Sequence, residues 1–373
     1  MSKINLWAKA FPPVTGGVEF YSRQVASALD RQQMLGGVVT WAEDSQPRPE
    51  YDGSVAVTCL PGGSDVRCAL SGLRQMFGKT ARAEGLILAT TWKAAVPAFV
   101  SGKNYVVSAH GKEIYASGAV HYLAKMVYAR ARAIVCVSGV TADRLIAEYA
   151  LPRHKVHVAW NGLTDERLLL TNPTEKWASF DDEIVFYTIC RHEPRKNIPH
   201  AIRAFAALKN RAHRPGRKLT FLIAGTGPTI DAERALVSEL GLHDSVVHLG
   251  RVSDEDLIAL HQKAHIFLHP QIAMDAGKDF EGFGLVVADA MAAGSLVVTG
   301  RSGGTGELFV DGEQGLYVSG EDVDETVARL VEYLRNPAQL RRIAEQAQLK
   351  ARTAFQWDNV TRILKGCLSD AAR

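Results

Sequence analysis

Short apolar runs alternate with amphipathic segments along nearly the whole chain, and this alternation restricts the fold more than any other feature. The runs are rich in Val, Ile, Leu and Ala and are bounded by polar residues, which is typical of buried strands. Between them, apolar residues recur at helical spacing, for example at Val18, Tyr21 and Val25. Strands that alternate with helices predict an α/β fold whose parallel sheets carry helices on both faces.

The predicted strands fall into two groups along the chain. They comprise residues 4–8, 55–60, 86–90, 105–108, 133–138 and 156–159, then residues 184–190, 219–224, 246–249, 266–268, 296–299 and 315–318. The segment 164–183 between the groups is polar and contains Pro173 and an Asp-Asp-Glu run, so we interpret it as an interdomain linker. We therefore expect two doubly wound domains, with a ligand in the crevice at the carboxyl ends of the strands.

The composition excludes several other classes of protein. Apolar residues make up 47% of the chain and charged residues 22%, which fits a globular protein with a large core. The five cysteines form no C-x-x-C pair and no histidines stand at zinc-site spacing, so we expect a reduced, cytoplasmic protein without a metal centre. Neither a signal peptide nor an apolar stretch of membrane-spanning length is predicted. With 43 basic and 40 acidic residues, the chain is too balanced in charge for a nucleic-acid partner.

Basic residues are nevertheless concentrated in one part of the first half. Residues 60–132 contain 10 Lys or Arg against 3 Asp or Glu. Two helix-like pieces, 66–82 and 121–132, carry most of these basic residues, and the second interleaves them with Tyr122 and Met126. The pattern indicates either a surface that contacts an anionic partner or a solvated basic face without one.

Two motifs of the first half combine a predicted strand with glycine. Gly16 and Gly17 follow the strand 4–8 and open a helix, where N–H groups without a neighbouring Cβ can approach an anion closely. His110 follows the strand 105–108 and precedes Gly111, which places the imidazole at the carboxyl end of the sheet. The alternatives are a plain strand-to-helix turn and a structural histidine.

Two motifs of the second half indicate an anion. The run Arg191-His192-Glu193-Pro194-Arg195-Lys196-Asn197 lies between the strand 184–190 and a helix predicted over 199–208. Two to three cations, Arg191 and Lys196 among them, therefore stand beside a helix N-terminus that is itself positive. A diphosphate would join these positive groups, and a solvated charge run is the alternative. The turn Gly225-Thr226-Gly227-Pro228 lacks the third glycine of a dinucleotide fingerprint, so we interpret it as a tight turn near a ligand.

A pair of carboxylates indicates sugar recognition. Glu281 enters a glycine-bracketed turn, and Asp289 follows eight residues later among apolar side chains. An unpaired carboxylate there would be costly, so Asp289 needs a partner, for which sugar hydroxyls are candidates. An internal helix cap with a buried ion pair is the alternative.

The ordered set of motifs resembles the retaining glycosyltransferases of family 4, the glycosyl transferases group 1, which have the GT-B architecture of two Rossmann-like domains and an interdomain cleft. The resemblance extends from Pro12 to Trp357. It rests on Gly16-Gly17, His110-Gly111, Val158-Ala159-Trp160-Asn161-Gly162, Arg191 with Lys196, Gly225-Thr226-Gly227-Pro228, the E-G-F-G-L run Glu281–Leu285, Gly303-Gly304-Thr305-Gly306-Glu307, Asp311-Gly312-Glu313-Gln314-Gly315 and Phe355-Gln356-Trp357. One departure is Asp289, because the second acid of the family is usually Glu.

The resemblance implies a division of labour between two domains. Residues 1–168 would bind the acceptor and residues 169–354 the nucleotide sugar, with a C-terminal helix at about 355–373 packed back on the first domain. The residues implied in catalysis are His110, Arg191, Lys196 and Glu281. Those implied in donor binding are Gly16, Gly17, Gly225, Val252, Phe283, Gly284, Leu285 and Asp289.

The resemblance also assigns roles to these residues. Arg191 and Lys196 would hold the diphosphate and stabilise the leaving group in place of a metal, so no cofactor is expected. Gly16 and Gly17 would face the distal phosphate, and Val252 would lie in the loop that meets the base. Glu281 and His110 would contact the transferred sugar, with backbone N–H groups supplied by residues 283–285. Asp289 would hold the ribose.

The implied function is transfer of a sugar from a UDP- or GDP-linked donor to a glycan, lipid-linked or small-molecule acceptor in cell-surface glycan biosynthesis, with retention and an α-linked product. The alternatives are a nucleotide-sugar 2-epimerase of the same architecture and an inactive nucleotide-sugar-binding protein. Because the acceptor would bind the first domain, we expect its basic segment 60–132 to contact an anionic acceptor or the inner face of an anionic membrane.

Overall fold

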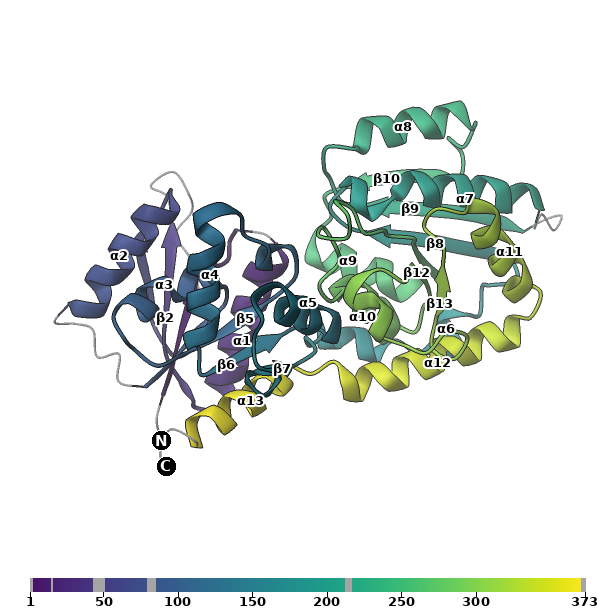
Figure 1. Ribbon diagram of the computed structural model, residues 1–373. Helices are drawn as coiled ribbons and strands as arrows, with labels where there is room; N and C mark the ends of the chain where they lie inside the picture. Colours follow the sequence, from purple (N-terminus) through teal and green to yellow (C-terminus); the bar gives the residue numbers. More distant parts are fainter. Residues whose placement is uncertain (1–2, 15, 43–50, 79–84, 212–216, 370–373) are drawn as a thin grey trace. The chain divides into compact units, whose positions relative to one another are not determined.

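The computed structural model describes residues 3–14, 16–42, 51–78, 85–211 and 217–369, which form two compact units (Figure 1). The first unit comprises Met1–Gly162 and Gln356–Arg373, and the second comprises Leu163–Phe355. The chain leaves the first unit at Gly162, earlier than the boundary placed at residue 168. The reason is that Thr164 hydrogen-bonds Asp289 and Leu168 is fully buried, both within the second unit.

The first unit contains a parallel sheet with the strand order β3-β2-β1-β4-β5-β6-β7. Its described strands are β1 (Ile4–Ala8), β2 (Leu35–Ala42), β3 (Val57–Pro61), β4 (Leu86–Ala89), β5 (Tyr105–Ala109), β6 (Ala133–Cys136) and β7 (Val156–Val158). The strand β2 was not predicted. Gly36 and Gly37 interrupt its apolar pattern, although the following Val-Val-Thr-Trp run is typical of a strand.

Helices cover both faces of this sheet. The described helices are α1 (Gly17–Arg31), α2 (Asp65–Phe77), α3 (Trp92–Val100), α4 (Gly118–Arg130), α5 (Gly139–Tyr149) and α13 (Asp358–Ser369), with short 3₁₀ turns η1 (Lys112–Ile114) and η2 (Arg153–Lys155). Ser64, Thr91 and Ser138 cap α2, α3 and α5 with side-chain oxygens. Because crossovers between parallel strands are right-handed, α1 and α3 cover opposite faces.

The C-terminal segment is anchored on α1. Trp357 lies against Gly162, Phe20 and Tyr21, and its ring centroid is 5.8 Å from that of Tyr21. The Gln32 side-chain amide donates hydrogen bonds to Asp358 and Thr361 of α13, both at 2.9 Å. A Cβ at position 162 would collide with the Trp357 ring, so this close approach requires glycine.

The second unit contains a parallel sheet with the strand order β10-β9-β8-β11-β12-β13. Its described strands are β8 (Glu183–Ile189), β9 (Lys218–Ala224), β10 (Val246–Gly250), β11 (Ile266–His269), β12 (Leu296–Gly300) and β13 (Leu316–Val318). Its helices are α6 (Pro173–Lys176), α7 (Ile198–Arg211), α8 (Ile230–Glu239), α9 (Asp254–Lys263), α10 (Leu285–Ala292), α11 (Val323–Leu334) and α12 (Pro337–Ala354), with 3₁₀ turns η3 (Glu166–Leu170), η4 (Pro194–Lys196) and η5 (Gly303–Glu307).

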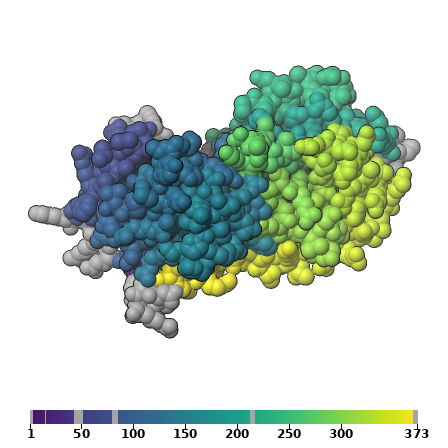
Figure 2. Space-filling view, viewed as in Figure 1, coloured from purple at the N-terminus to yellow at the C-terminus, as the bar shows by residue number. Residues whose placement is uncertain are grey.

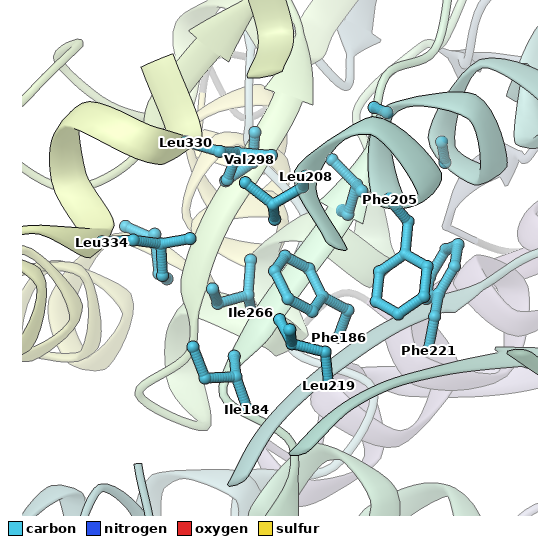
Figure 3. Packing of buried hydrophobic residues seen from close by; sticks show 14 of the residues in the cluster. Ile184, Phe186, Phe205, Leu208, Leu219, Phe221, Ile266, Val298, Leu330 and Leu334 are labelled. Carbon is cyan, nitrogen blue, oxygen red and sulfur yellow. The ribbon is translucent and has the colours of Figure 1, made fainter. Parts of the chain in front are cut away.

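The core of the second unit lies between one face of the sheet and the helices α7, α8, α11 and α12. Figure 3 shows Phe205 facing Phe186 and Phe221, with ring centroids 5.5 Å apart in both pairs. The apolar face of α7 thus fills the space over β8 and β9. The opposite face of β8 carries Tyr187, whose hydroxyl bonds His261 of α9 at 2.9 Å.

The segment 164–183 is not a linker, contrary to our interpretation of its polar composition. It forms η3 and α6, and Trp177 and Phe180 are buried. The buried Lys176 ammonium donates to the carbonyls of His261 and Ala293 and to the Ser295 hydroxyl, at 2.7, 2.8 and 2.6 Å. Burial lowers the pKa of Lys176 well below its usual value. The three hydrogen bonds of Lys176 therefore help to hold the polar segment 164–183 within the second unit.

Each sheet has one point where the strand order reverses. In the first it lies between β1 and β4, and in the second between β8 and β11. Loops that leave neighbouring strands there diverge and open a crevice at their carboxyl ends, which is where α/β sheets bind ligands. Among the described helices, none has the length and hydropathy that crossing a membrane would require.

Candidate functional site

The loop after β8 carries the basic motif in a fixed conformation. Residues Pro194–Lys196 form η4, and Asn197 follows in the left-handed region with φ of 56°. The Asn197 side-chain amide donates to the carbonyls of Pro270 at 2.9 Å and Gly320 at 2.7 Å. Asparagine tolerates this backbone conformation better than most residues, and the two bonds hold the loop against the segments after β11 and β13.

The structure brings Lys196 and Glu281, which the resemblance places in the same donor site, into direct contact. The Lys196 ammonium bonds the Glu281 carboxylate, and Arg195 Nη1 donates to Glu281 Oε2 at 2.8 Å. Arg195 also pairs with Asp279, with 3.4 Å between Nε and Oδ1. Burial alone would raise the pKa of Glu281, but Lys196 and Arg195 outweigh it and hold this pKa well below its usual range.

Arg195 and Asp279 are site residues that sequence reasoning missed. The signal for Arg195 was its place in the same basic run as Lys196. Arg191, in contrast, has a side chain that is 71% exposed and pairs with Glu193, whose carboxylate also lies 4.0 Å from Arg195. The structure therefore separates a buried cation, Lys196, from an exposed one, Arg191.

The glycine turn after β9 packs directly on the loop after β8. Gly225 has φ of 122° and donates its N–H to the Gly250 carbonyl at 2.8 Å. A Cβ on Gly225 would collide with the Cys190 carbonyl, and one on Gly227 would collide with the His192 carbonyl. Both positions therefore require glycine, because the backbones of the two loops touch.

The start of α10 presents unsatisfied backbone donors. Gly284 has φ of 97°, and a Cβ there would lie 2.5 Å from the Thr305 methyl carbon. Within the described part of the chain, the N–H groups of Phe283, Gly284 and Leu285 meet no acceptor. Such N–H groups at a helix N-terminus can bind an anion or a hydroxyl oxygen. Glu281 lies in the same loop.

Asp289 has its partner within the protein, whereas sugar hydroxyls were our candidates for it. It is 1% exposed, and its carboxylate accepts hydrogen bonds from the Thr164 N–H at 2.9 Å and the Thr164 hydroxyl at 2.8 Å. The partner is thus a residue of the same unit. Sequence reasoning could not find it, because Thr164 lies 125 residues earlier, in the segment assigned as a linker.

Val252 lies in the loop between β10 and α9. It precedes Ser253, the N-cap of α9, and lines a hollow of about 910 Å³ together with residues of α9 and β9. Arg191, Lys196 and Glu281 do not line this hollow. Val252 thus lines a hollow that is not formed by the residues assigned to the diphosphate.

In the first unit, Gly16, Gly17 and His110 lie at the carboxyl edge of the sheet. Gly17 begins α1, and the Glu19 carboxylate folds back against Gly16. The His110 ring contacts that of Tyr21 on α1, with centroids 4.5 Å apart. His110 Nε2 lies 2.7 Å from the Thr90 carbonyl, which can only accept, so Nε2 carries the proton and Nδ1 is left as an acceptor.

Potential metal ligands are not clustered in the described ranges. There, no group of three or more His, Cys, Asp or Glu side chains is placed to hold a metal ion. The charged groups of the site are instead the cations and carboxylates of the loops after β8 and β11.

Two family models match the chain. Glycosyltransferase Family 4 matches residues 15–167, and Glycosyl transferases group 1 matches residues 172–350. Together they span most of the chain. The first covers most of the first unit and the start of the second, and the other lies within the second unit.

Curated relatives match over nearly the full length. A GDP-mannose-dependent alpha-(1-6)-phosphatidylinositol monomannoside mannosyltransferase from Mycolicibacterium smegmatis is 28% identical over 369 residues, which cover 93% of each chain. A GDP-mannose-dependent monoacylated alpha-(1-6)-phosphatidylinositol monomannoside mannosyltransferase from Corynebacterium glutamicum is 27% identical over 363 residues, covering 93% of this chain and 92% of that one.

Solved structures share the fold. The sucrose-phosphate synthase of Thermosynechococcus elongatus superposes with a TM-score of 0.79 at 18% identity, covering 100% of both chains. At this identity the likeness shows the fold alone, namely two Rossmann-like domains with parallel sheets. Taken with the family models and the named relatives, it shows that the chain belongs to the family 4 glycosyltransferases of GT-B architecture and is a hexosyltransferase-type enzyme.

Proposed function

We propose that the protein transfers a hexose from a nucleoside diphosphate sugar to a hydroxyl group of a lipid-linked acceptor, with retention of configuration. The observation that carries the proposal is the cluster of Lys196, Arg195 and Glu281 beside the open N–H groups of α10. Among UDP- and GDP-linked donors, GDP-mannose is favoured because two full-length relatives are named as GDP-mannose-dependent enzymes. Their named acceptors are phosphatidylinositol mannosides, which supports a lipid-linked acceptor.

The donor half of the site divides into groups for phosphate and groups for sugar. Lys196 and Arg191 neutralise the diphosphate, and the Gly225 turn keeps Cβ atoms away from the loop that carries them. Glu281 accepts hydrogen bonds from sugar hydroxyls while the N–H groups of residues 283–285 donate to oxygens. Gly16 and Gly17 face the distal phosphate, and the loop at Val252 meets the base.

The chemistry is a displacement on one face of the sugar. The bond between the anomeric carbon and the phosphate oxygen breaks with its electron pair on the phosphate. The acceptor oxygen bonds the same carbon from the same face and gives its proton to the leaving phosphate. Lys196 and Arg191 stabilise the charge that develops there, so a metal is not required. His110 Nδ1 orients a hydroxyl of the transferred sugar.

The function is tested by incubating the protein with labelled GDP-mannose and anionic glycolipid, with and without EDTA. We expect a labelled lipid with an α-linkage, equally in both samples. An epimerised nucleotide sugar formed from donor alone would instead establish the 2-epimerase alternative. GDP binding without turnover would establish the inactive binding protein, and loss of transfer in EDTA would overturn the metal-free mechanism.

Removing the cations should slow the chemical step. In Lys196→Ala and in Arg191→Ala we expect kcat to fall roughly 100-fold or more, because each loses charge stabilisation of the leaving group. Arg203→Ala, an exposed cation on α7, is the matched control and should retain wild-type kcat. Near-normal turnover in both site variants would contradict the assignment to the diphosphate.

Asp289 is better suited to holding Thr164 than to a direct ribose contact. Burial raises the pKa of Asp289 to about 7, although the hydrogen bonds from Thr164 act in the opposite direction. In the unfolded chain this carboxyl has its ordinary pKa of 3.8. Between about pH 4 and pH 7 the folded state therefore binds more protons, so stability falls as pH rises through that window.

Asp289→Asn should remove this pH dependence, because the amide is neutral. Its oxygen can still accept from the Thr164 N–H, and its NH₂ group can donate to the Thr164 hydroxyl oxygen. Relative to the wild type, we expect the variant's free energy of unfolding to rise by on the order of 2 kcal/mol between pH 5 and pH 8. Denaturant unfolding at both pH values measures this. If the free energies of unfolding of the wild type and the variant changed equally between the two pH values, the raised pKa of Asp289 would be contradicted. Weaker GDP binding in the variant would show that Asp289 also contacts the ribose.

The basic segment of the first unit forms a surface suited to an anionic membrane. On α2, Val66, Leu70 and Phe77 are exposed and lie within an arc of about 40°, flanked by Arg67 and Arg74. Lys79 and Arg82, which belong to the helix-like piece predicted over 66–82, lie outside the described residues. An apolar stripe beside basic residues is typical of helices that lie at a membrane surface.

The helix α4 extends this surface. It exposes Val120, Tyr122 and Met126 together with Lys125 and Arg130. Both α2 and α4 pack against α3, and Figure 2 shows their blue segments at the surface of the unit. A lipid-linked acceptor at the inner face of the cell membrane would thus be met by the domain that the resemblance assigns to the acceptor.

Vesicle binding tests this surface. We expect wild-type protein to bind phosphatidylglycerol vesicles at low salt, and Arg67→Glu with Arg74→Glu to weaken binding about tenfold or more, at about 1 kcal/mol per basic residue. Arg335→Glu with Arg342→Glu changes the net charge equally on the second unit and should leave binding unchanged. Absence of wild-type binding would contradict membrane contact.

A further inference from the structure

A buried pair of charged and polar side chains underlies the loop that carries Arg191 and Lys196. His192, in that loop, and Glu233, on α8, are both fully buried. His192 Nδ1 lies 2.6 Å from Glu233 Oε2, and the Thr229 hydroxyl donates to Glu233 Oε1 at 2.6 Å. His248 of β10 approaches the same carboxylate, with 3.7 Å between Nε2 and Oε2. None of these residues has a role in the proposed chemistry.

Glu233 is ionised, which decides the direction of the hydrogen bond. Burial alone would raise the pKa of Glu233, but the bond from His192 and the other contacts outweigh burial and lower it to about 2. An ionised carboxylate only accepts, so His192 Nδ1 carries the proton and donates. Hydrogen bonds to a buried charge are among the stronger ones in proteins.

The backbone of His192 connects the loop to the glycine turn. Its N–H donates to the Thr226 carbonyl at 3.0 Å, and its carbonyl accepts from the Thr229 N–H at 3.3 Å. The His192 carbonyl also lies where a Cβ of Gly227 would be, and its ring carbon Cδ2 would lie 3.2 Å from a Cβ on Gly225. His192 is thus joined to the turn by one backbone bond, to the N-cap residue of α8 by a second, and to Glu233 of α8 by its side chain.

We propose that His192 and Glu233 form a positioning pair that fixes the Arg191–Lys196 loop against the Gly225 turn. The positions of the residues on both sides of His192 depend on this pair. Arg191 precedes His192 directly, and Glu193 follows it and accepts a hydrogen bond at its carbonyl from the Lys196 N–H at 2.9 Å. If His192 loses its hydrogen bond to Glu233, Arg191 and Lys196 are no longer held in fixed positions relative to the Gly225 turn. Both cationic side chains nevertheless remain present. The inference rests on the proposed diphosphate site.

Variants at His192 separate the hydrogen bond from packing. The side-chain amide of His192→Asn places an N–H donor near the position of Nδ1, whereas His192→Phe keeps the ring volume without the donor. We expect GDP to bind His192→Asn with near wild-type Kd. We expect it to bind His192→Phe and Glu233→Gln at least about tenfold more weakly, since a hydrogen bond to a buried charge is lost or weakened and the loop is no longer fixed. Isothermal titration with GDP measures this.

A matched variant on the same helix controls for loss of stability. Leu236 is buried on α8 and faces the core, so Leu236→Ala should lower the thermal midpoint but leave the GDP Kd unchanged. Wild-type affinity in His192→Phe, or weaker binding in His192→Asn than in His192→Phe, would overturn the positioning pair. If wild-type protein binds neither GDP nor UDP, the proposed function itself fails, and the inference with it.

Discussion

The ion cluster of Glu281 with Lys196 and Arg195 is the interaction on which the candidate site depends. It joins the loop after β8 to the loop after β11, at the point where the strand order of the second sheet reverses. Each of these charges would be costly to bury alone, and together they compensate one another. The two loops are therefore held in a single arrangement, against which the Gly225 turn and the start of α10 are placed.

Buried polar contacts also decide where the second unit begins. Thr164 bonds the Asp289 carboxylate, and the Lys176 ammonium meets three oxygen acceptors. Because of these contacts, the segment 164–183 belongs to the second unit although its composition is typical of a linker. The same principle applies to His192 and Glu233, where a buried carboxylate is satisfied by donors from separate elements.

Much of the fold was predictable because buried parallel strands are continuous apolar runs and the helices between them are amphipathic. The exception, β2, contains Gly36 and Gly37, and its identity as a strand depends on pairing with β1 and β3 rather than on its own pattern. The glycines of the site were predictable as turns. Their necessity became clear only from the carbonyls of Cys190 and His192, which a Cβ would meet.

By itself, the sequence determined the two α/β domains and the ordered motifs, because these follow from local patterns and their order. The assignment of Lys196 and Glu281 to one site came from the family resemblance that those motifs carry. The tertiary structure alone decided which polar and charged side chains are partners. It pairs Asp289 with Thr164, gives Glu281 a second cationic partner in Arg195, and leaves Arg191 exposed. The physical reason is that burial makes each polar group depend on its neighbours in space, and those neighbours lie far apart in the sequence.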